Sequence, residues 1–348
     1  MKKRFLVTLL CVLATLLIAA GCSPSEDEPT IINVYNWGEY IDQSVLDEFY
    51  AQTGIEVNYT QYATNEEMYA KLKSGGANYD VVIPSDYMIG RMIKEDMLEK
   101  IDFSNIPNYQ YVDSNFTNME YDPQNEYSIP YMWGNVGILY NTKYVDDVVD
   151  SWDILWNEKY SGQILMFDNS RDAIGIALKK LGYSYNTTDE AQLRAAMQEL
   201  EKQKPFVQSY VMDQIFDKME GEEAYIGPYY AGDAITIMDS NPDIAFAVPK
   251  EGTNIFIDAM VIPKDAKNKQ AAELFINFMC SAETGLANAE EIGYSTPLTN
   301  VMEIMDPEMR ENEIAYPSDE VLEKAEVFKN LPQETLDLYD ALWVELMS

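Results

Sequence analysis

Residues 31–84 read IINVYNWGEYIDQSVLDEFYAQTGIEVNYTQYATNEEMYAKLKSGGANYDVVIP, a stretch in which strand patterns alternate with helix patterns. The strand patterns cover 31–36, 55–59 and 80–84, and the helix patterns cover 44–50 and 65–73. Ser44 is the expected N-cap of the first helix, and Gly54 is expected to end it. The run 80–84 is short and mostly apolar, which is typical of a strand buried in a parallel sheet. A βαβαβ beginning of this kind predicts an α/β layer fold.

The rest of the chain continues the same alternation. Further strands are expected at 162–167 and 244–249, and further helices at 173–181 and 191–204. Two extended stretches, 137–141 and 257–262, look like crossings between two lobes. A chain of 348 residues suits two domains, because single hydrophobic cores stop growing near about 250–300 residues. If both stretches join the same lobes, lobe one holds 31–136 plus 259–305, and lobe two holds 137–258 plus 306–348.

The N-terminal residues predict export and anchoring. A short cationic start is followed by Phe5–Ala20, an apolar run too short for a comfortable membrane span, which indicates a secretory signal over 1–21. Cys22 follows small residues in an arrangement that resembles a bacterial lipobox, although Ala19 stands where that pattern prefers Leu or Val. We expect an acylated Cys22 and a polar tether over 22–30, with an ordinary cleaved signal as the alternative. The protein is then exported, and is either lipid-anchored to the outer face of the cell membrane or periplasmic.

Charge and composition exclude several classes of function. The chain has 59 acidic and 24 basic residues, for a formal net charge of −35. Nucleic acid is excluded as a partner, because phosphate contacts need clustered Lys and Arg. The sequence contains no histidine, which rules out histidine triads and histidine-ligated zinc, and we expect neither a metal nor a cofactor. Cys280 is the one cysteine of the folded body, so we expect no disulfide and a buried, inert thiol.

The loops that follow the predicted strands are the expected place for a site, because open α/β sheets bind ligands outside the carboxyl ends of their strands. Four of these six loops couple an aromatic ring to a carboxylate. The six loops are Trp37–Tyr40, Ser85–Tyr87, Asp168–Asp172, Tyr229–Asp233, Phe256–Asp258 and Gly293–Pro297. Rings stack on methylenes and attract ammonium groups, and carboxylates accept charge-assisted hydrogen bonds from them. The loops therefore suit a ligand with cationic ends and an apolar middle, such as a linear polyamine.

Plainer readings of single residues remain open. Asp168 could cap the helix that follows it, and Asp172 could lie in the first turn of that helix without a further role. The arginines of the mature chain are Arg91, Arg171, Arg194 and Arg310. Only Arg171 falls in a candidate loop, where the flanking Asp168 and Asp172 would neutralise it. An anionic ligand is thus disfavoured, because receptors usually hold anions with arginine forks.

Four segments carry a family resemblance: VYNWGEYI at 34–41, YDVVIPS at 79–85, YSIPYMWG at 127–134 and IGYSTP at 292–297. Through them the chain resembles the spermidine/putrescine-binding proteins of ABC transporters, in order and over nearly the whole mature chain. The resemblance implies a periplasmic-binding-protein-like fold with two α/β lobes, a ligand cleft between them and closure on binding. It implies a solute receptor, not an enzyme, that delivers a polyamine to ABC permease subunits. We expect a monomer.

The resemblance also carries ligand-binding positions onto this chain. They are Trp37, Tyr40, Ser85, Tyr87, Asp168, Asn169, Asp172, Ser209, Tyr230, Phe256, Asp258 and Tyr294. Asp258 matches a family carboxylate that holds an amine, and Asp172 falls on a family glutamate that is one methylene longer. Asn169 occupies the position of another amine-binding aspartate, with Asp168 adjacent. Tyr230 and Phe256 stand where tryptophan occurs in the family. Ser209 is a looser match, and a family glutamine near Phe328 has no clear counterpart.

Two other functions are compatible with these residues. A receptor of the same fold could bind another small ligand, such as a sugar or a different organic cation, since tyrosine-rich loops suit sugars too. A surface glycosidase that works with two carboxylates is the third possibility. The acid pairs Glu66-Glu67 and Glu222-Glu223 are available to it, but adjacent acids on helices are usually solvated.

Overall fold

The structure of the protein is a computed structural model that describes residues 30–76 and 78–348. The expected signal peptide over 1–21, the acylation site Cys22 and the tether up to residue 29 lie outside the described residues. No helix in the described part of the chain is long and apolar enough to cross a membrane. Residues 31–348 form one compact unit, which contains every helix and strand named below.

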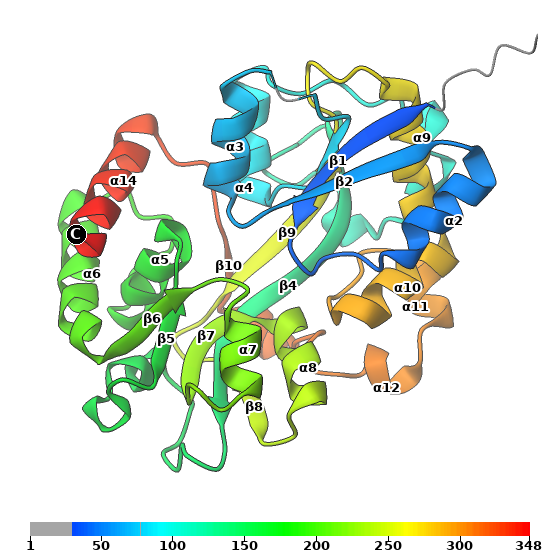
Figure 1. The fold of residues 1–348 in the computed structure, drawn as a ribbon. Coiled ribbons are helices and arrows are strands. Elements are labelled where there is room, and N and C mark those ends of the chain that lie inside the picture. The colour runs from blue at the N-terminus through cyan, green and yellow to red at the C-terminus, as the bar shows by residue number, and fades with distance from the viewer. Residues whose placement is uncertain (1–29, 77) are drawn as a thin grey trace, which may run out of the picture. The chain divides into compact units, whose positions relative to one another are not determined.

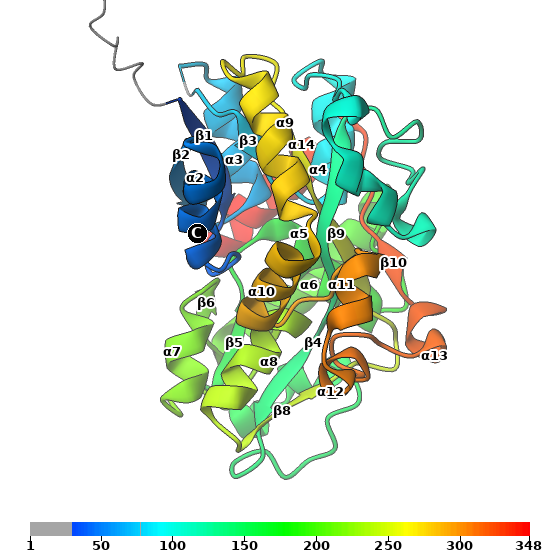
Figure 2. The same cartoon turned by 90° about the vertical axis from the view of Figure 1, so that its right-hand side faces the viewer.

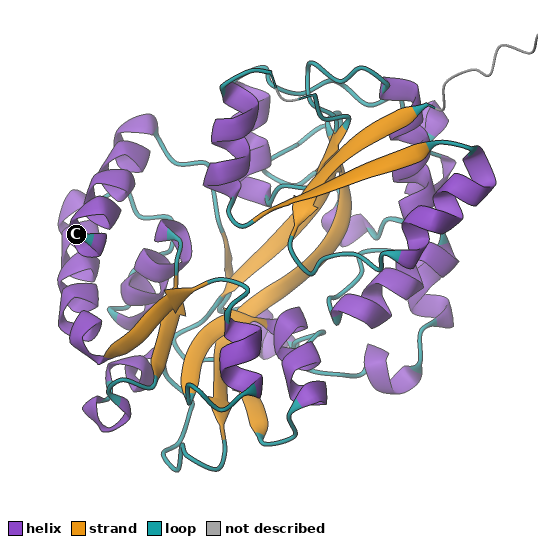
Figure 3. Cartoon of the chain, viewed as in Figure 1, coloured by secondary structure: helices purple, strands orange, loops and turns teal. Residues whose placement is uncertain are grey.

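A ten-stranded mixed sheet runs through the described residues (Figure 1 and Figure 3). Its strands are β1 (Ile31–Trp37), β2 (Glu56–Tyr62), β3 (Val81–Val82), β4 (Ser128–Asn141), β5 (Ile164–Phe167), β6 (Val207–Val211), β7 (Ile226–Tyr230), β8 (Ile244–Ala247), β9 (Asn254–Val261) and β10 (Glu326–Val327). The main path has the order β2-β1-β3-β9-β4-β7-β5-β6, with β10 beside β9 and β8 beside β4. The β2-β1-β3 and β7-β5-β6 groups are parallel, whereas β9 and β4 run antiparallel to their neighbours on this path. The predicted α/β class is confirmed.

The long strands β4 and β9 join the two parallel groups. β4 pairs with β9 as far as Asn135 and with β7 from Val136 onward. The stretches predicted to cross between lobes, 137–141 and 257–262, therefore lie largely in these two strands. Both stretches thus belong to β4 and β9, the strands that the two parallel groups share. The division of the chain into two lobes stays a prediction.

Strand β4 is much longer than predicted, because it begins at Ser128 rather than at residue 137. Pro130 and Gly134 obscure the strand pattern, since both residues are unfavourable inside a strand. The structure accommodates Pro130 at an irregularity in the register with β9. Gly134 is required, because a Cβ atom there would lie 2.8 Å from the Phe256 ring. A strand that contains these two residues can be recognised only when the strand it pairs with is known.

Helices cover the sheet on both sides. They are α2 (Ser44–Thr53), α3 (Asn65–Lys73), α4 (Asp86–Lys94), α5 (Ser170–Lys180), α6 (Glu190–Gln203), α7 (Ile215–Glu220), α8 (Ala231–Ser240), α9 (Lys269–Met279), α10 (Ala282–Ile292), α11 (Thr299–Ile304), α12 (Pro307–Arg310), α13 (Asp319–Leu322) and α14 (Gln333–Met347). Short 3₁₀ turns occupy Phe103–Asn105, Pro107–Tyr111, Ser114–Phe116, Trp152–Trp156, Glu158–Tyr160 and Lys204–Phe206. Figure 2 shows α9, α10 and α11 following one another along one side of the sheet, where α10 contacts both α2 and α8. The C-terminal α14 packs on α5 and α6.

Local details confirm some expectations and correct others. Gly54 ends α2 with a positive φ of 71°, as predicted, but Ser44 does not cap this helix. Gln43 occupies the N-cap without a side-chain bond, and the Asp42 carboxylate accepts from the Ser44 amide instead. The predicted strand 80–84 shrinks to Val81–Val82, although the backbone amides of Asp80 and Ile83 still donate to carbonyls of β1.

Cys280 is completely buried directly after α9 and has no disulfide partner in the described part of the chain. Burial raises the pKa of its thiol to about 12, so the thiolate is absent at neutral pH. The expectation of a small, buried and inert side chain is confirmed for the folded body.

Candidate functional site

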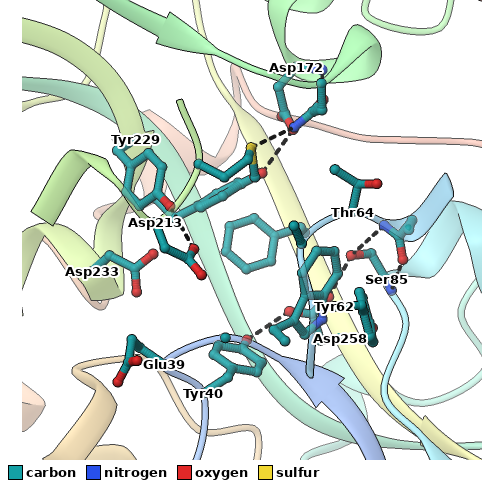
Figure 4. A pocket seen from close by; sticks show the side chains of 18 of the residues that line it. Glu39, Tyr40, Tyr62, Thr64, Ser85, Asp172, Asp213, Tyr229, Asp233 and Asp258 are labelled. Atoms are coloured by element: carbon teal, nitrogen blue, oxygen red, sulfur yellow. Dashed lines mark hydrogen bonds between the residues drawn. The ribbon is translucent and has the colours of Figure 1, made fainter. Parts of the chain in front are cut away.

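A deep pocket lies where the ends of several strands meet the first turns of α3, α4, α5 and α8 (Figure 4). We call it the inner pocket, and it contains about 780 Å³ of space between protein atoms, including its opening to solvent. Its aromatic walls are formed by Trp37, Tyr40, Tyr62, Tyr87, Phe216, Tyr229, Tyr230, Phe256, Tyr294 and Phe328. Its acidic side chains are Glu39, Glu66, Asp172, Asp213, Asp233 and Asp258. None of the described residues that line it is a lysine or an arginine.

Most of the positions carried over from the resemblance meet in this pocket. Ten of the twelve line it: Trp37, Tyr40, Ser85, Tyr87, Asn169, Asp172, Tyr230, Phe256, Asp258 and Tyr294. Asp168 and Ser209 lie outside the lining. Asp168 is exposed to solvent, and Ser209 belongs to β6, where it pairs with Leu165. The structure thus brings the predicted set together except for these two, while contact with a ligand stays a prediction for all twelve.

Asp258 is held between two hydroxyl groups. It comes from the shared strand β9 and is only 4% exposed. The Ser85 hydroxyl donates to Asp258 Oδ1 at 2.6 Å, and the Tyr40 hydroxyl donates to Oδ2 at 2.7 Å. Burial raises the pKa of Asp258 to about 6, although both hydrogen bonds oppose this shift. A buried carboxylate in this state gains stability from a cation that enters the pocket.

Asp172 forms a second acidic position, in the first turn of α5. The Tyr230 hydroxyl donates to Asp172 Oδ2 at 2.9 Å, and the Asn169 amide nitrogen donates to the same oxygen at 2.7 Å. Burial again raises the pKa of the carboxyl, to about 6, against these hydrogen bonds. Asn169 is also the N-cap of α5, because its Oδ1 accepts from the Asp172 backbone amide at 2.8 Å. Asn169 therefore orients Asp172, and the possibility that Asp168 caps this helix is wrong.

Glu66 is a pocket residue that sequence reasoning missed. Adjacent acids on a helix such as Glu66 and Glu67 are expected to be solvated, and Glu67 is indeed exposed. Glu66, however, lines the pocket and accepts a hydrogen bond of 2.9 Å from the Tyr87 hydroxyl, while burial raises its pKa. The signal that could have found it is its position, because the loop between β2 and α3 also follows the end of a strand.

A third acidic group consists of Glu39, Asp213 and Asp233. Figure 4 shows these side chains gathered on one side of the pocket, away from Asp172 and Asp258. Asp233 lies in the first turn of α8 and is buried, which raises its pKa well above the ordinary value. The Tyr229 hydroxyl donates to Asp213 at 3.3 Å. Asp213 passes so close to Gly38 that any side chain at position 38 would collide with its carboxylate.

Arg171 behaves differently from the expectation that Asp168 and Asp172 neutralise it. No ion pair from Arg171 to either aspartate is present among the described residues. The buried guanidinium lies over the rings of Tyr87 and Phe328, at 4.8 and 4.6 Å from their centroids. It sits behind the pocket wall rather than in the lining. No arginine therefore reaches into the pocket to bind an anion. This agrees with the expectation that the ligand is not anionic.

The inner pocket combines acidic side chains with aromatic rings, so it can attract cations. Among the residues that the structure describes, no cluster of three or more acidic, cysteine or histidine side chains is arranged to hold a metal ion. Three acidic positions are separated by aromatic rings. Such an arrangement suits a flexible molecule with several charged nitrogens joined by methylenes.

Comparison with known proteins places the chain in a family. Residues 44–316 match the family described as "Bacterial extracellular solute-binding protein". A "Spermidine/putrescine-binding periplasmic protein" of Escherichia coli (strain K12) is 38% identical over 313 residues, which cover 89% of this chain and 90% of that protein.

Two solved structures have the same fold. A spermidine/putrescine ABC transporter substrate-binding protein, PotD, from Streptococcus pneumoniae is 38% identical with a TM-score of 0.78, covering 91% of this chain and 98% of that chain. The Tp0655 lipoprotein of Treponema pallidum is 28% identical with a TM-score of 0.80, covering 91% and 99%. The described fold is therefore the periplasmic-binding-protein-like fold, and this chain belongs to the family of bacterial extracellular solute-binding proteins.

Proposed function

We propose that this protein is the substrate-binding component of an ABC importer and captures a polyamine, spermidine or putrescine, outside the cell membrane. The observation that carries the proposal is the inner pocket: six acidic side chains alternate with aromatic rings, and no basic side chain of the described residues enters the lining. The printed names of the E. coli and S. pneumoniae relatives support the same ligand class.

Each part of the pocket has a role in this proposal. Asp258, fixed by Tyr40 and Ser85, binds one ammonium group, and Asp172 with Glu66 binds another. The aromatic walls pack on the methylenes between the nitrogens and add cation–π attraction of about 0.5–2 kcal/mol per contact. The raised pKa values of Asp172 and Asp258 fit this role, because a bound ammonium supplies the positive charge that the pocket otherwise lacks.

The remaining assignments belong to the same proposal. The two lobes, 31–136 plus 259–305 and 137–258 plus 306–348, close over the ligand about β4 and β9. The protein acts as a monomeric receptor without catalysis and passes its ligand to membrane permease subunits. It is anchored outside the cell membrane through an acylated Cys22, and a relative described as a lipoprotein supports this anchoring.

Isothermal titration calorimetry of the exported protein with putrescine and spermidine tests the proposal. We expect saturable binding of at least one of the two at a stoichiometry of one. Titration of neutral mono- and disaccharides serves as the comparison, because a sugar receptor is the main alternative. Binding of a sugar without binding of any polyamine would contradict the proposed ligand class. It would leave the assignment to the solute-binding protein family unchanged.

A further inference from the structure

A second cavity borders the acidic side of the inner pocket. We call it the outer cavity, and it shares Glu39, Asp213, Phe216 and Asp233 with the inner pocket. Its own lining residues are Ile41, Asp217, Thr236, Glu291 and Ile292. It encloses about 860 Å³ of space between protein atoms, which includes its opening to solvent. The two cavities are therefore neighbouring compartments that meet at the third acidic group.

The outer cavity repeats the chemistry of the inner pocket. Ile41, Phe216 and Ile292 form an apolar floor, of which the two isoleucines are buried. Asp217 on α7 and Glu291 on α10 are exposed at its mouth. No lysine or arginine of the described residues lines it. An apolar floor with carboxylates at its far end suits a short methylene chain that carries a terminal ammonium group.

Asp233 provides an independent observation at the junction of the two cavities. Its side chain lines both of them, yet the residue is only 8% exposed. Within the described part of the chain no lysine or arginine forms an ion pair with it, and the Tyr294 hydroxyl lies in hydrogen-bonding range of its carboxylate. The Tyr294 hydroxyl is close enough to lower the pKa of Asp233, but burial outweighs this effect. A buried carboxylate without a cationic partner, lining two neighbouring cavities, is costly unless a cation comes to it.

We propose that the outer cavity is an additional subsite that receives the terminal aminopropyl group of a linear tetraamine, so that the receptor accepts polyamines longer than spermidine. This inference rests on the proposed function. In it, the inner pocket holds three nitrogens along Asp172, Asp258 and Asp233, and the chain continues past Asp233 over the apolar floor. The fourth ammonium group then lies between Asp217 and Glu291, at the mouth.

Calorimetric titrations with spermidine, a triamine, and spermine, a tetraamine, test this subsite. The variant carries Asp217→Asn and Glu291→Gln together, which removes both charges at the mouth. We expect it to bind spermine about 5- to 20-fold more weakly than the wild type does. Its affinity for spermidine should change less than twofold. The matched control is Glu290→Gln, which removes an exposed charge from the neighbouring position of α10 outside both cavities.

The outcomes separate this inference from the proposed function. Equal weakening for both ligands, or no weakening for either, overturns the subsite and leaves the polyamine receptor intact. A wild type that binds spermidine and rejects spermine overturns it as well. A wild type that binds no polyamine contradicts the proposed function itself. If the control weakens spermine binding as much as the double variant does, the effect comes from the overall negative charge of the protein. That result also overturns the subsite.

Discussion

Asp80 and Asp258 are both almost completely buried, at 1% and 4% exposure, yet their surroundings differ in kind. Asp80 accepts hydrogen bonds of 2.8 to 2.9 Å from three backbone amides, those of Asn33, Lys267 and Asn268. Asp258 accepts from two side-chain hydroxyls and borders the inner pocket. Backbone donors are fixed by the fold, whereas hydroxyl donors can turn and share their acceptor with a ligand. The comparison therefore separates a carboxylate that ties segments together from one that is available for binding.

Replacing Asp80 tests the structural half of this comparison and has the largest expected effect. Asp80→Ala leaves three partly buried backbone amides without their charged acceptor, so the free energy of unfolding should fall by about 3–5 kcal/mol. Chemical denaturation measures this loss. Ligand affinity of the folded fraction should stay within about twofold of the wild type, because Asp80 does not line the pocket. A loss below about 1 kcal/mol would mean that water or the neighbouring segments replace the carboxylate.

Replacing Asp258 tests the binding half. Asp258→Ala should weaken polyamine binding by about 2–5 kcal/mol, the range for breaking a desolvated, hydrogen-bonded charge pair. The unfolding free energy at pH 7 should not fall, since a buried carboxylate with a raised pKa is itself unfavourable. The control is Asp265→Ala, which removes an exposed charge. Unchanged affinity in the Asp258 variant would remove this residue from the site.

The pH dependence sharpens the comparison further. The pKa of Asp258 in the empty protein is about 6, above its ordinary value near 3.8, so the folded state binds more protons than the unfolded state between these values. Stability contributed by protonated Asp258 is present at low pH and is lost as the pH rises through 6. Relative to Asp258→Asn, the ligand-free wild type should lose about 2 kcal/mol of unfolding free energy between pH 4.5 and 7.5.

Polyamine affinity should change in the opposite direction over the same pH range, because the ammonium ligand needs the ionised carboxylates. We expect binding to strengthen from pH 4.5 to 7.5, and to do so less in Asp258→Asn. Calorimetry and thermal unfolding of the same samples measure both trends. Parallel trends in stability and affinity would contradict the role of Asp258 as a strained, ligand-facing carboxylate.

Glu66 and its neighbour give the smallest expected effect and a matched pair of variants. Glu66→Gln should weaken polyamine binding by about 1–2 kcal/mol, since it keeps the shape of the Tyr87 contact but removes the charge. Glu67→Gln should leave affinity unchanged, because Glu67 is exposed and accepts from the Ala63 amide at the start of α3. Titrations of both variants with the same ligand compare them directly. Equal effects would mean that only overall charge matters here.

Much of the fold could be predicted because hydrophobic patterning and end signals act locally. The helix at 65–73 has the predicted bounds, and Gly54 ends α2 as its left-handed conformation requires. The strand β4 could not be predicted in full, since Pro130 and Gly134 make sense only against β9. The start of α2 at Ser44 was predicted correctly, but its capping was not, because Asp42 rather than Ser44 supplies the acceptor.

The candidate site divides in the same way. The strand-end rule located Asp172 and several aromatic walls, because the ends of parallel strands converge. The expected loop Phe256–Asp258 was wrong, since these residues lie inside the antiparallel strand β9, and the resemblance is what located Asp258. Sequence reasoning could not decide whether Asn169 contacts a ligand or caps α5. The answer depends on the direction of its side chain, which only the structure shows. Glu66 escaped because adjacent acids look alike in sequence, and only the turn of α3 decides which one faces inward.

A crystal structure of the exported protein grown with spermidine tests the central claim most directly, because it shows which carboxylates the ligand uses. We predict density for a linear molecule in the inner pocket, with nitrogens at hydrogen-bonding distance, about 2.7–3.2 Å, from the carboxylates of Asp258 and Asp172. Its methylenes should lie against Tyr230 and Phe256. An empty inner pocket at saturating spermidine, or a ligand whose nitrogens avoid both aspartates, would contradict the account.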